Sequence, residues 1–172
     1  MCIAALAMLL AIAALGGENA TKDMINSNIQ ASDTYSFYQA KNIRQTSFRL
    51  AREELELVLP TLPPEAQTRA RERIESYRLT EARYESEPDT GEGKTELLAK
   101  ARQYEAARNR AQRQDPNFDY AQALFQIAVV LGSLSVVAVS GRVLALSLLL
   151  GAIAILLTAN GFLLLFDLPL GG

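Results

Sequence analysis

The distribution of charge along the chain restricts its possible folds more than any other feature. Of the 36 charged residues among 172, 34 lie between Glu18 and Asp119, and the other two are Arg142 and Asp167. Three segments contain no charge, at 1–17, 120–141 and 143–166. About 20 apolar residues in a helix cross the hydrocarbon of a bilayer, and a helix satisfies its own backbone there. We therefore predict three transmembrane helices and a charged segment between the first two.

The first charge-free segment, 1–17, has two interpretations. It is short for a membrane span, and a cleaved secretory signal contains a similar apolar stretch. Such a signal also has a basic region before the apolar one, which this segment lacks, and Cys2 lies too close to the start for a lipoprotein cleavage site. We interpret the segment as a retained membrane anchor, with a cleaved signal as the alternative.

The second and third charge-free segments are each long enough to span a membrane alone. We predict that 120–166 forms a transmembrane helical hairpin with a tight turn at 140–142, followed by a short tail at 167–172. Asp115 followed by Pro116 is typical of an N-cap with proline at the first helical position. We therefore expect a helix to begin there and to run into the membrane.

The segment 18–119 is one-third charged and lacks an alternating apolar pattern, which favours helices over strands. Prolines and glycines divide it into three predicted helices, at about 20–59, 65–86 and 94–114. The first should be continuous with the first span. It is about 60 Å long at 1.5 Å per residue, and the next two are about half that length. We expect these two to fold back along it in an elongated helical bundle or coiled coil, which makes the chain an all-α membrane protein.

The apolar stripe of the long helix is thin and extends farther than two short partners can cover, so self-association would bury the remainder. In the predicted spans, small residues at helical spacing and uncharged polar residues favour close packing and hydrogen bonds between helices. These contacts could lie within one chain, between subunits or around a pore. The predicted packing or oligomer residues are Ile25, Ile29, Phe37, Phe48, Leu55, Gln126, Gly132, Gly151 and Asn160.

Composition argues against most enzyme chemistry. The chain has no His and a single Cys, so the sequence indicates no catalytic residue, no metal site and no cofactor. The run Gly91-Glu92-Gly93-Lys94-Thr95 is similar to the end of a phosphate-binding loop, but Pro88 stands where that motif needs its first glycine. Positive and negative charges are interspersed and the net charge is −2, so we expect no nucleic-acid binding and no small-molecule substrate.

Four blocks of the sequence resemble one known family. They are 31–45 (ASDTYSFYQAKNIRQ), 91–101, 113–121 (RQDPNFDYA) and the terminal hairpin as far as 160–162. Together they are similar to DUF4337, an uncharacterised bacterial membrane-protein family, over nearly the whole chain. The resemblance implies an inner-membrane protein with an N-terminal span, a helical middle and a C-terminal hairpin, and it implies no activity or catalytic residue. Family members generally have a charged tail before the first span, which is absent here.

The distribution of arginines indicates on which side of the membrane the segment 18–119 lies. Four of them, Arg102, Arg108, Arg110 and Arg113, precede the second span, whereas Arg142 stands alone in the hairpin turn. This distribution favours a cytoplasmic position, although a segment of about 100 residues can cross a membrane regardless of its charge, and a basic tail before the first span would place it outside.

The function that we expect is a structural or scaffolding role in the lipid bilayer. The protein would form a homo-oligomer or serve as an accessory subunit of a larger membrane complex, such as a photosynthetic or respiratory one. The alternative is a small oligomeric channel or transport element, because polar residues are scattered along the last two spans.

Overall fold

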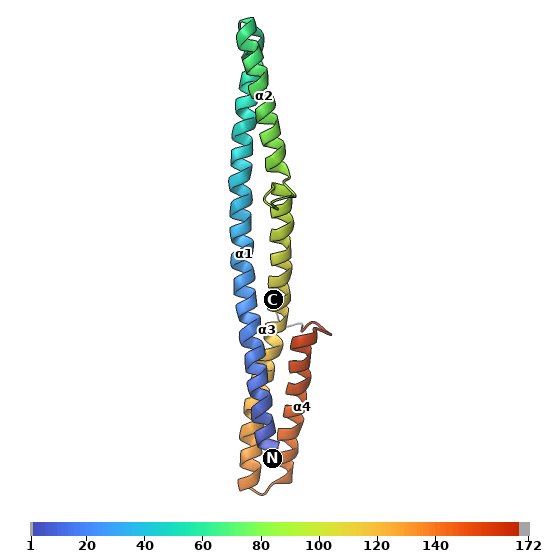
Figure 1. Cartoon of the computed structure of the whole chain (residues 1–172). Coiled ribbons are helices and arrows are strands. Elements are labelled where there is room, and N and C mark those ends of the chain that lie inside the picture. The colour runs from blue at the N-terminus through green and yellow to red at the C-terminus, as the bar shows by residue number, and fades with distance from the viewer. Residues whose placement is uncertain (1, 169–172) are drawn as a thin grey trace. The chain divides into compact units, whose positions relative to one another are not determined.

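A computed structural model describes residues 2–168, and every regular element within that range is a helix (Figure 1). The elements are α1 (Cys2–Val58), the short 3₁₀ helix η1 (Leu59–Thr61), α2 (Pro64–Glu85), α3 (Lys94–Val137) and α4 (Gly141–Leu163). Three of them, α1, α3 and α4, are long and apolar enough to cross a membrane. The all-α class is therefore confirmed for the described residues.

The chain divides into two compact units. The apolar unit comprises 1–27 and 106–172, and the charged unit comprises 28–105. Helices α1 and α3 each contribute residues to both units, whereas α2 belongs to the charged unit and α4 to the apolar unit.

Prolines and a glycine separate the helices of the charged unit. Pro60 lies in η1, and Pro64 is the first residue of α2, where its missing amide hydrogen costs nothing because the first helical amides have no partner within the helix. In the connection to α3, Gly91 has a φ of +68°, which a residue without Cβ adopts easily. Glu96 stabilises the start of α3, because its carboxylate accepts hydrogen bonds from the Ser86 hydroxyl (2.6 Å) and the Glu87 amide (3.2 Å).

The expectation that a helix begins at Pro116 is wrong. Pro116 lies inside α3, which continues without a break from Lys94 to Val137. Asp115 does not act as an N-cap, since its carboxylate instead accepts a hydrogen bond from the Thr21 hydroxyl of α1 (2.9 Å). The side-chain amide of Asn117, the residue after the proline, donates to the Arg113 carbonyl of the preceding turn (2.9 Å).

The turn between α3 and α4 comes slightly earlier than the predicted 140–142. Helix α3 ends at Val137, and Val139 adopts a left-handed conformation with a φ of 50°, which interrupts the helix. The Ser140 amide donates to the Ser135 carbonyl (3.2 Å) and closes the turn. Gly141 and Arg142 are consequently the first residues of α4 rather than residues of the turn.

Candidate helix-packing sites

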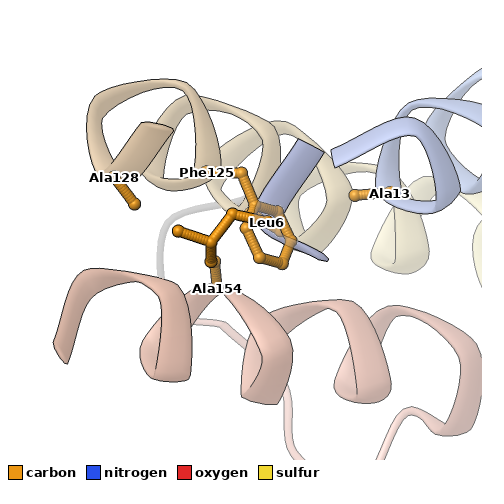
Figure 2. Close-up of a cluster of buried hydrophobic side chains, with 6 residues drawn as sticks. Leu6, Ala13, Phe125, Ala128 and Ala154 are labelled. Carbon is orange, nitrogen blue, oxygen red and sulfur yellow. The ribbon is translucent and has the colours of Figure 1, made fainter. Parts of the chain in front are cut away.

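The core of the apolar unit is built from one face of each of its three helices. Figure 2 shows Leu6 of α1 beside Phe125 of α3 and Ala154 of α4. The other three residues of this buried cluster are alanines, which let helix backbones approach closely. The buried cluster consists of Leu6, Ala13, Ala121, Phe125, Ala128 and Ala154.

Phe118 joins all three helices of the apolar unit at one level. Its ring is 2% exposed and contacts Gly16 of α1 and Gly161 of α4 so closely that a Cβ added at Gly161 would lie 2.7 Å from the ring. Phe162 packs edge-on against the same ring, with 4.9 Å between the ring centroids. Both glycines are therefore required by a specific aromatic side chain and not by backbone conformation.

An asparagine pair lies beside this aromatic contact. The side-chain amide of Asn160 donates to the side-chain oxygen of Asn117 (2.7 Å), and both side chains are almost completely buried. Asn160 also holds the residues that follow α4, because it donates to the Phe166 carbonyl (2.9 Å) and accepts from the Phe166 amide (3.0 Å). One side chain thus links α4, α3 and the segment after α4.

Small residues mark a second level of contact, farther along the hairpin. The Ser147 hydroxyl of α4 donates to the Ala128 carbonyl of α3 (2.6 Å). A Cβ at Gly132 would lie 3.1 Å from the Ser147 oxygen, and one at Gly151 would lie 2.6 Å from Leu6. These contacts hold α1, α3 and α4 in a single register along the apolar unit.

The charge-free parts of the three helices share one boundary in this register. Thr21 of α1 bonds Asp115 of α3, and Arg113 of α3 forms an ion pair with Asp167 after α4 (3.5 Å). Gly17 of α1 lies against Phe118 of α3. The next residue after Gly17 is Glu18, the first charge after the first apolar segment, and the next residue after Phe118 is Asp119, the last charge before the second. All three apolar segments therefore end at the same level.

In the charged unit, aromatic side chains fix α2 against α1. The ring of Phe48 on α1 packs against Tyr77 and Tyr84 of α2, with centroid distances of 5.6 and 5.8 Å. Leu55, two turns farther along α1, is half-buried. Both residues lie on the face of α1 that α2 covers.

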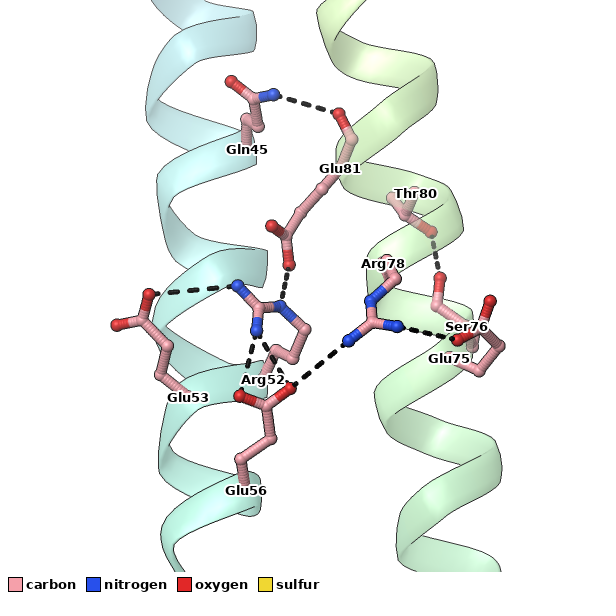
Figure 3. Close-up of polar contacts among 9 residues, drawn as sticks. All are labelled: Gln45, Arg52, Glu53, Glu56, Glu75, Ser76, Arg78, Thr80 and Glu81. Carbon is pink, nitrogen blue, oxygen red and sulfur yellow. Dashed lines mark hydrogen bonds and ion pairs between the residues drawn. The ribbon is translucent and has the colours of Figure 1, made fainter.

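Arg52 forms the main polar link between α1 and α2 (Figure 3). Its guanidinium donates to Glu81 of α2 (2.8 Å) and to both carboxylate oxygens of Glu56 on its own helix (2.9 and 3.0 Å). These hydrogen bonds, first to Glu81 and then to Glu56, raise the pKa of Arg52 above its ordinary value. The Arg52 side chain is 18% exposed and that of Glu81 16%, so this pair is well shielded from water.

Two lysines connect α1 with the loop before α3 and with the start of α3. The ammonium of Lys41, whose side chain is 7% exposed, lies 3.7 Å from Glu87 and 3.5 Å from Glu92 and above the rings of Phe37 and Tyr84. Lys94 donates to the Gln45 side-chain oxygen (2.8 Å). Block 31–45 of the family resemblance thus contacts block 91–101, just as Asn117 and Asn160 join the other two blocks.

The structure divides the predicted packing residues into two groups. Phe48 and Leu55 lie against α2, and Gly132, Gly151 and Asn160 are buried in the apolar unit. The remaining four are exposed, namely Ile25, Ile29, Phe37 and Gln126. Whether a partner covers this second group stays a prediction.

Sequence reasoning missed Lys41, Asn117 and Phe118. A lysine in a charged helix is usually solvated, and no local pattern predicts that Lys41 is buried. Asn117 and Phe118 follow Pro116 directly, and the expectation of a helix start concealed their role as contact residues. The small residues Gly16 and Gly161 were the available signal, since glycine in a membrane helix often marks close contact with a neighbour.

The arrangement is that of an all-helical protein with two packed units and three helices long enough to span a membrane. Within residues 2–168, no group of three or more His, Cys, Asp or Glu side chains gathers as a metal site would require. The family model of DUF4337, a domain of unknown function, matches residues 1–164, so the chain belongs to this family. No curated protein and no solved structure matches the chain.

Proposed function

We propose that this chain is a non-catalytic structural protein of the bacterial inner membrane. Its apolar unit would anchor it in the bilayer, and its charged unit would either self-associate or bind a larger membrane complex, such as a respiratory or photosynthetic one, as an accessory subunit. The common boundary of the three apolar segments supports the membrane part of the proposal, because spans of one bundle must leave the hydrocarbon at the same level.

The exposed face of α1 in the charged unit carries the scaffold part of the proposal. Ile43, Leu50 and Leu57 are 67%, 57% and 80% exposed and follow one another at steps of seven residues. Ala40 precedes Ile43 by three residues and Ser47 lies between Ile43 and Leu50, so residues 40–50 follow the alternating steps of three and four that are typical of a coiled-coil seam. Glu54 occupies the position between Leu50 and Leu57. Phe48 and Arg52 point the other way, toward α2, so the seam has no partner within the charged unit.

Cysteine crosslinking tests self-association through this seam. In a Cys2→Ser background, Leu50→Cys should form a covalent dimer in native membranes on mild oxidation. Leu79→Cys is the matched control, because Leu79 on α2 is also an exposed leucine (63%) but lies outside the seam. A protein that stays monomeric in membranes and in mild detergent, with no crosslink at Leu50→Cys, would contradict self-association.

Extraction from native membranes in mild detergent, followed by sizing and mass spectrometry, tests the accessory-subunit form of the proposal. Stoichiometric foreign subunits would support it. Recovery of the protein alone as a monomer, together with no crosslink at Leu50→Cys, would contradict both forms.

A small oligomeric channel is the second candidate, favoured by the exposed polar side chains of Gln126 and Ser133 on the apolar part of α3. No acidic or basic residue lies between them, and ion pathways generally need such groups or a ring of backbone carbonyls. If the channel proposal is right, sealed vesicles that contain the purified protein should release trapped ions or small solutes. The absence of any flux in its oligomeric form would contradict it.

A further inference from the structure

A stripe of polar and small residues runs along the exposed face of α3. Asp119, Gln126 and Ser133 follow one another at steps of seven, and three smaller apolar residues alternate with them. All six side chains are exposed, Val130 by 58% and Val137 by 84%. The residues of this stripe, called the α3 seam below, are Asp119, Ala123, Gln126, Val130, Ser133 and Val137.

The α3 seam faces away from the rest of the apolar unit. The residues of α3 that pack against α1 and α4 include Ala121, Phe125 and Ala128, which are completely buried. At 100° per residue, the middle of the α3 seam lies about 150° around the helix from the middle of this buried face. In a single copy of the chain, the seam would therefore contact lipid.

Lipid is a poor environment for Gln126. Its side-chain amide has no hydrogen-bond partner among residues 2–168, whereas the Ser133 hydroxyl is satisfied by the Val129 carbonyl of its own helix (2.9 Å). Gln126 lies seven residues past Asp119, about 10 Å along the helix and so inside the hydrocarbon. An amide without a partner there is unfavourable, and a neighbouring helix is the usual source of one.

We propose that the α3 seam is the contact through which two copies of this chain associate in the membrane, with Gln126 of one copy hydrogen-bonded to Gln126 of the other. This inference rests on the proposed membrane function and adds a second surface to it. Copies inserted in the same direction pack in parallel, so a two-fold contact along α3 brings the same residue of each copy to the same depth. A glutamine amide both donates and accepts, and it is therefore complementary to a second glutamine.

The remaining seam residues fit such a pair of helices. Alternating steps of three and four suit two helices crossing at about 20°, and Ala123 allows close approach next to the glutamines. Asp119 lies at the charged end of the seam, at the level where all three apolar segments end, so water can hydrate the two facing carboxylates. A foreign helix would have to supply an amide at the depth of Gln126, which a second copy supplies by symmetry.

Single cysteines in a Cys2→Ser background test the contact. Val130→Cys, in the α3 seam, should form a disulfide dimer in vesicles, whereas Leu156→Cys should not, although Leu156 on α4 is as exposed (67%). Gln126→Leu should weaken association of the labelled protein in vesicles, measured by energy transfer on lipid dilution, about 5- to 30-fold. Gln126→Asn should weaken this association less than Gln126→Leu does, because asparagine retains an amide that both donates and accepts.

The outcomes separate this inference from the proposed function. No crosslink at Val130→Cys and unchanged association of Gln126→Leu, with Leu50→Cys still crosslinking, would overturn the α3 contact and leave the scaffold intact. A crosslink at Val130→Cys without one at Leu50→Cys would support the α3 contact and contradict the α1 seam. Flux through vesicles that depends on Gln126 would mean that the stripe lines a pore, and would overturn the inference.

Discussion

The side-chain amide of Asn160 donates a hydrogen bond across 2.7 Å to the side-chain oxygen of Asn117, and neither residue is more than 1% exposed. The two residues stand 43 positions apart, on α4 and α3. Because Asn160 also holds both backbone groups of Phe166, every polar group of its side chain is used. The pair therefore fixes the end of α4 and the residues that follow it.

Replacing Asn160 by leucine should destabilise the apolar unit by about 1–3 kcal/mol, because the buried Asn117 oxygen would lose its partner and the two hydrogen bonds to the Phe166 backbone would also be lost. Thermal unfolding of the purified protein in detergent measures the change. Asn19→Leu serves as the control, since it makes the same change at an asparagine of α1 that is exposed.

The double variant Asn117→Leu with Asn160→Leu should lose less stability than the sum of the two single variants. Each single variant leaves one buried asparagine side chain without its partner, whereas the double variant leaves none. Strictly additive losses would show that the hydrogen bond between the two side chains does not contribute to stability.

Gly161 offers a test of the contact with Phe118. Gly161→Ala places a methyl group only 2.7 Å from the Phe118 ring. The resulting overpacking should lower the free energy of unfolding by about 1–3 kcal/mol. Gly141→Ala is a matched control, because nothing lies within 4 Å of a Cβ at the start of α4. That control should leave the melting temperature unchanged or raise it, since alanine favours a helix more than glycine does.

Phe118→Leu combined with Gly161→Ala should recover part of the stability that Gly161→Ala loses, because the smaller side chain leaves space for the added methyl group. A melting temperature that is the same for Gly161→Ala as for the unchanged protein would contradict the close packing of Phe118.

The helical elements could be predicted from local sequence because their signals are local. Charge-free segments and prolines determine where a helix can lie and where it must end, whatever the rest of the chain does. The predicted helices at about 65–86 and 94–114 accordingly begin within one residue of α2 and α3.

Pro116 shows where such reasoning fails. A proline after an aspartate is compatible with a helix start and also with a kinked helix interior, and the local sequence does not distinguish the two. The difference comes from Thr21, 94 residues away, which engages the Asp115 carboxylate that an N-cap would need. A tertiary contact therefore distinguishes a helix that continues through Pro116 from one that begins there.

Lys41 illustrates the same limit for the sites. Its burial depends on Glu87 and Glu92, which follow α2 in the loop before α3, so only the folded charged unit brings the partners together. The apolar residues of α1 are divided in a similar way. Phe48 and Leu55 face α2 while Ile29 and Phe37 are exposed, because α1 winds past a narrow partner that covers one face only.

Acid should destabilise the charged unit. Hydrogen bonds from Gln45 and then Lys94 lower the pKa of Glu85 below its ordinary 4.5, and a hydrogen bond from Ser86 does the same for Glu96. A carboxylate whose pKa is lowered by folding stabilises the fold at neutral pH, and this stability is lost as the pH falls below about 4.5 through the lowered pKa. The midpoint of thermal unfolding, followed by helical circular dichroism, should therefore fall between about pH 5 and pH 3.

Glu96→Gln should reduce this pH dependence, because glutamine keeps an oxygen that can accept from Ser86 but does not titrate. Its midpoint at neutral pH should be lower than that of the unchanged protein, and the difference should shrink in acid. A midpoint that stays constant or rises as the pH falls from 5 to 3 would contradict a stabilising role for these carboxylates.

The side of the membrane on which the charged unit lies should follow the arginines. Four arginines precede the apolar part of α3, and only Arg142 stands at its far end, which favours a cytoplasmic charged unit. In the Cys2→Ser background, Asp89→Cys in the loop before α3 should react with a membrane-impermeant maleimide only in inverted vesicles. Ala138→Cys, after α3, should react only in intact cells with a permeabilised outer membrane. The reverse pattern would place the charged unit outside, as a translocated segment of about 100 residues allows. Labelling of both cysteines from the same side would contradict a single crossing of the membrane by α3, since only that helix separates the two positions.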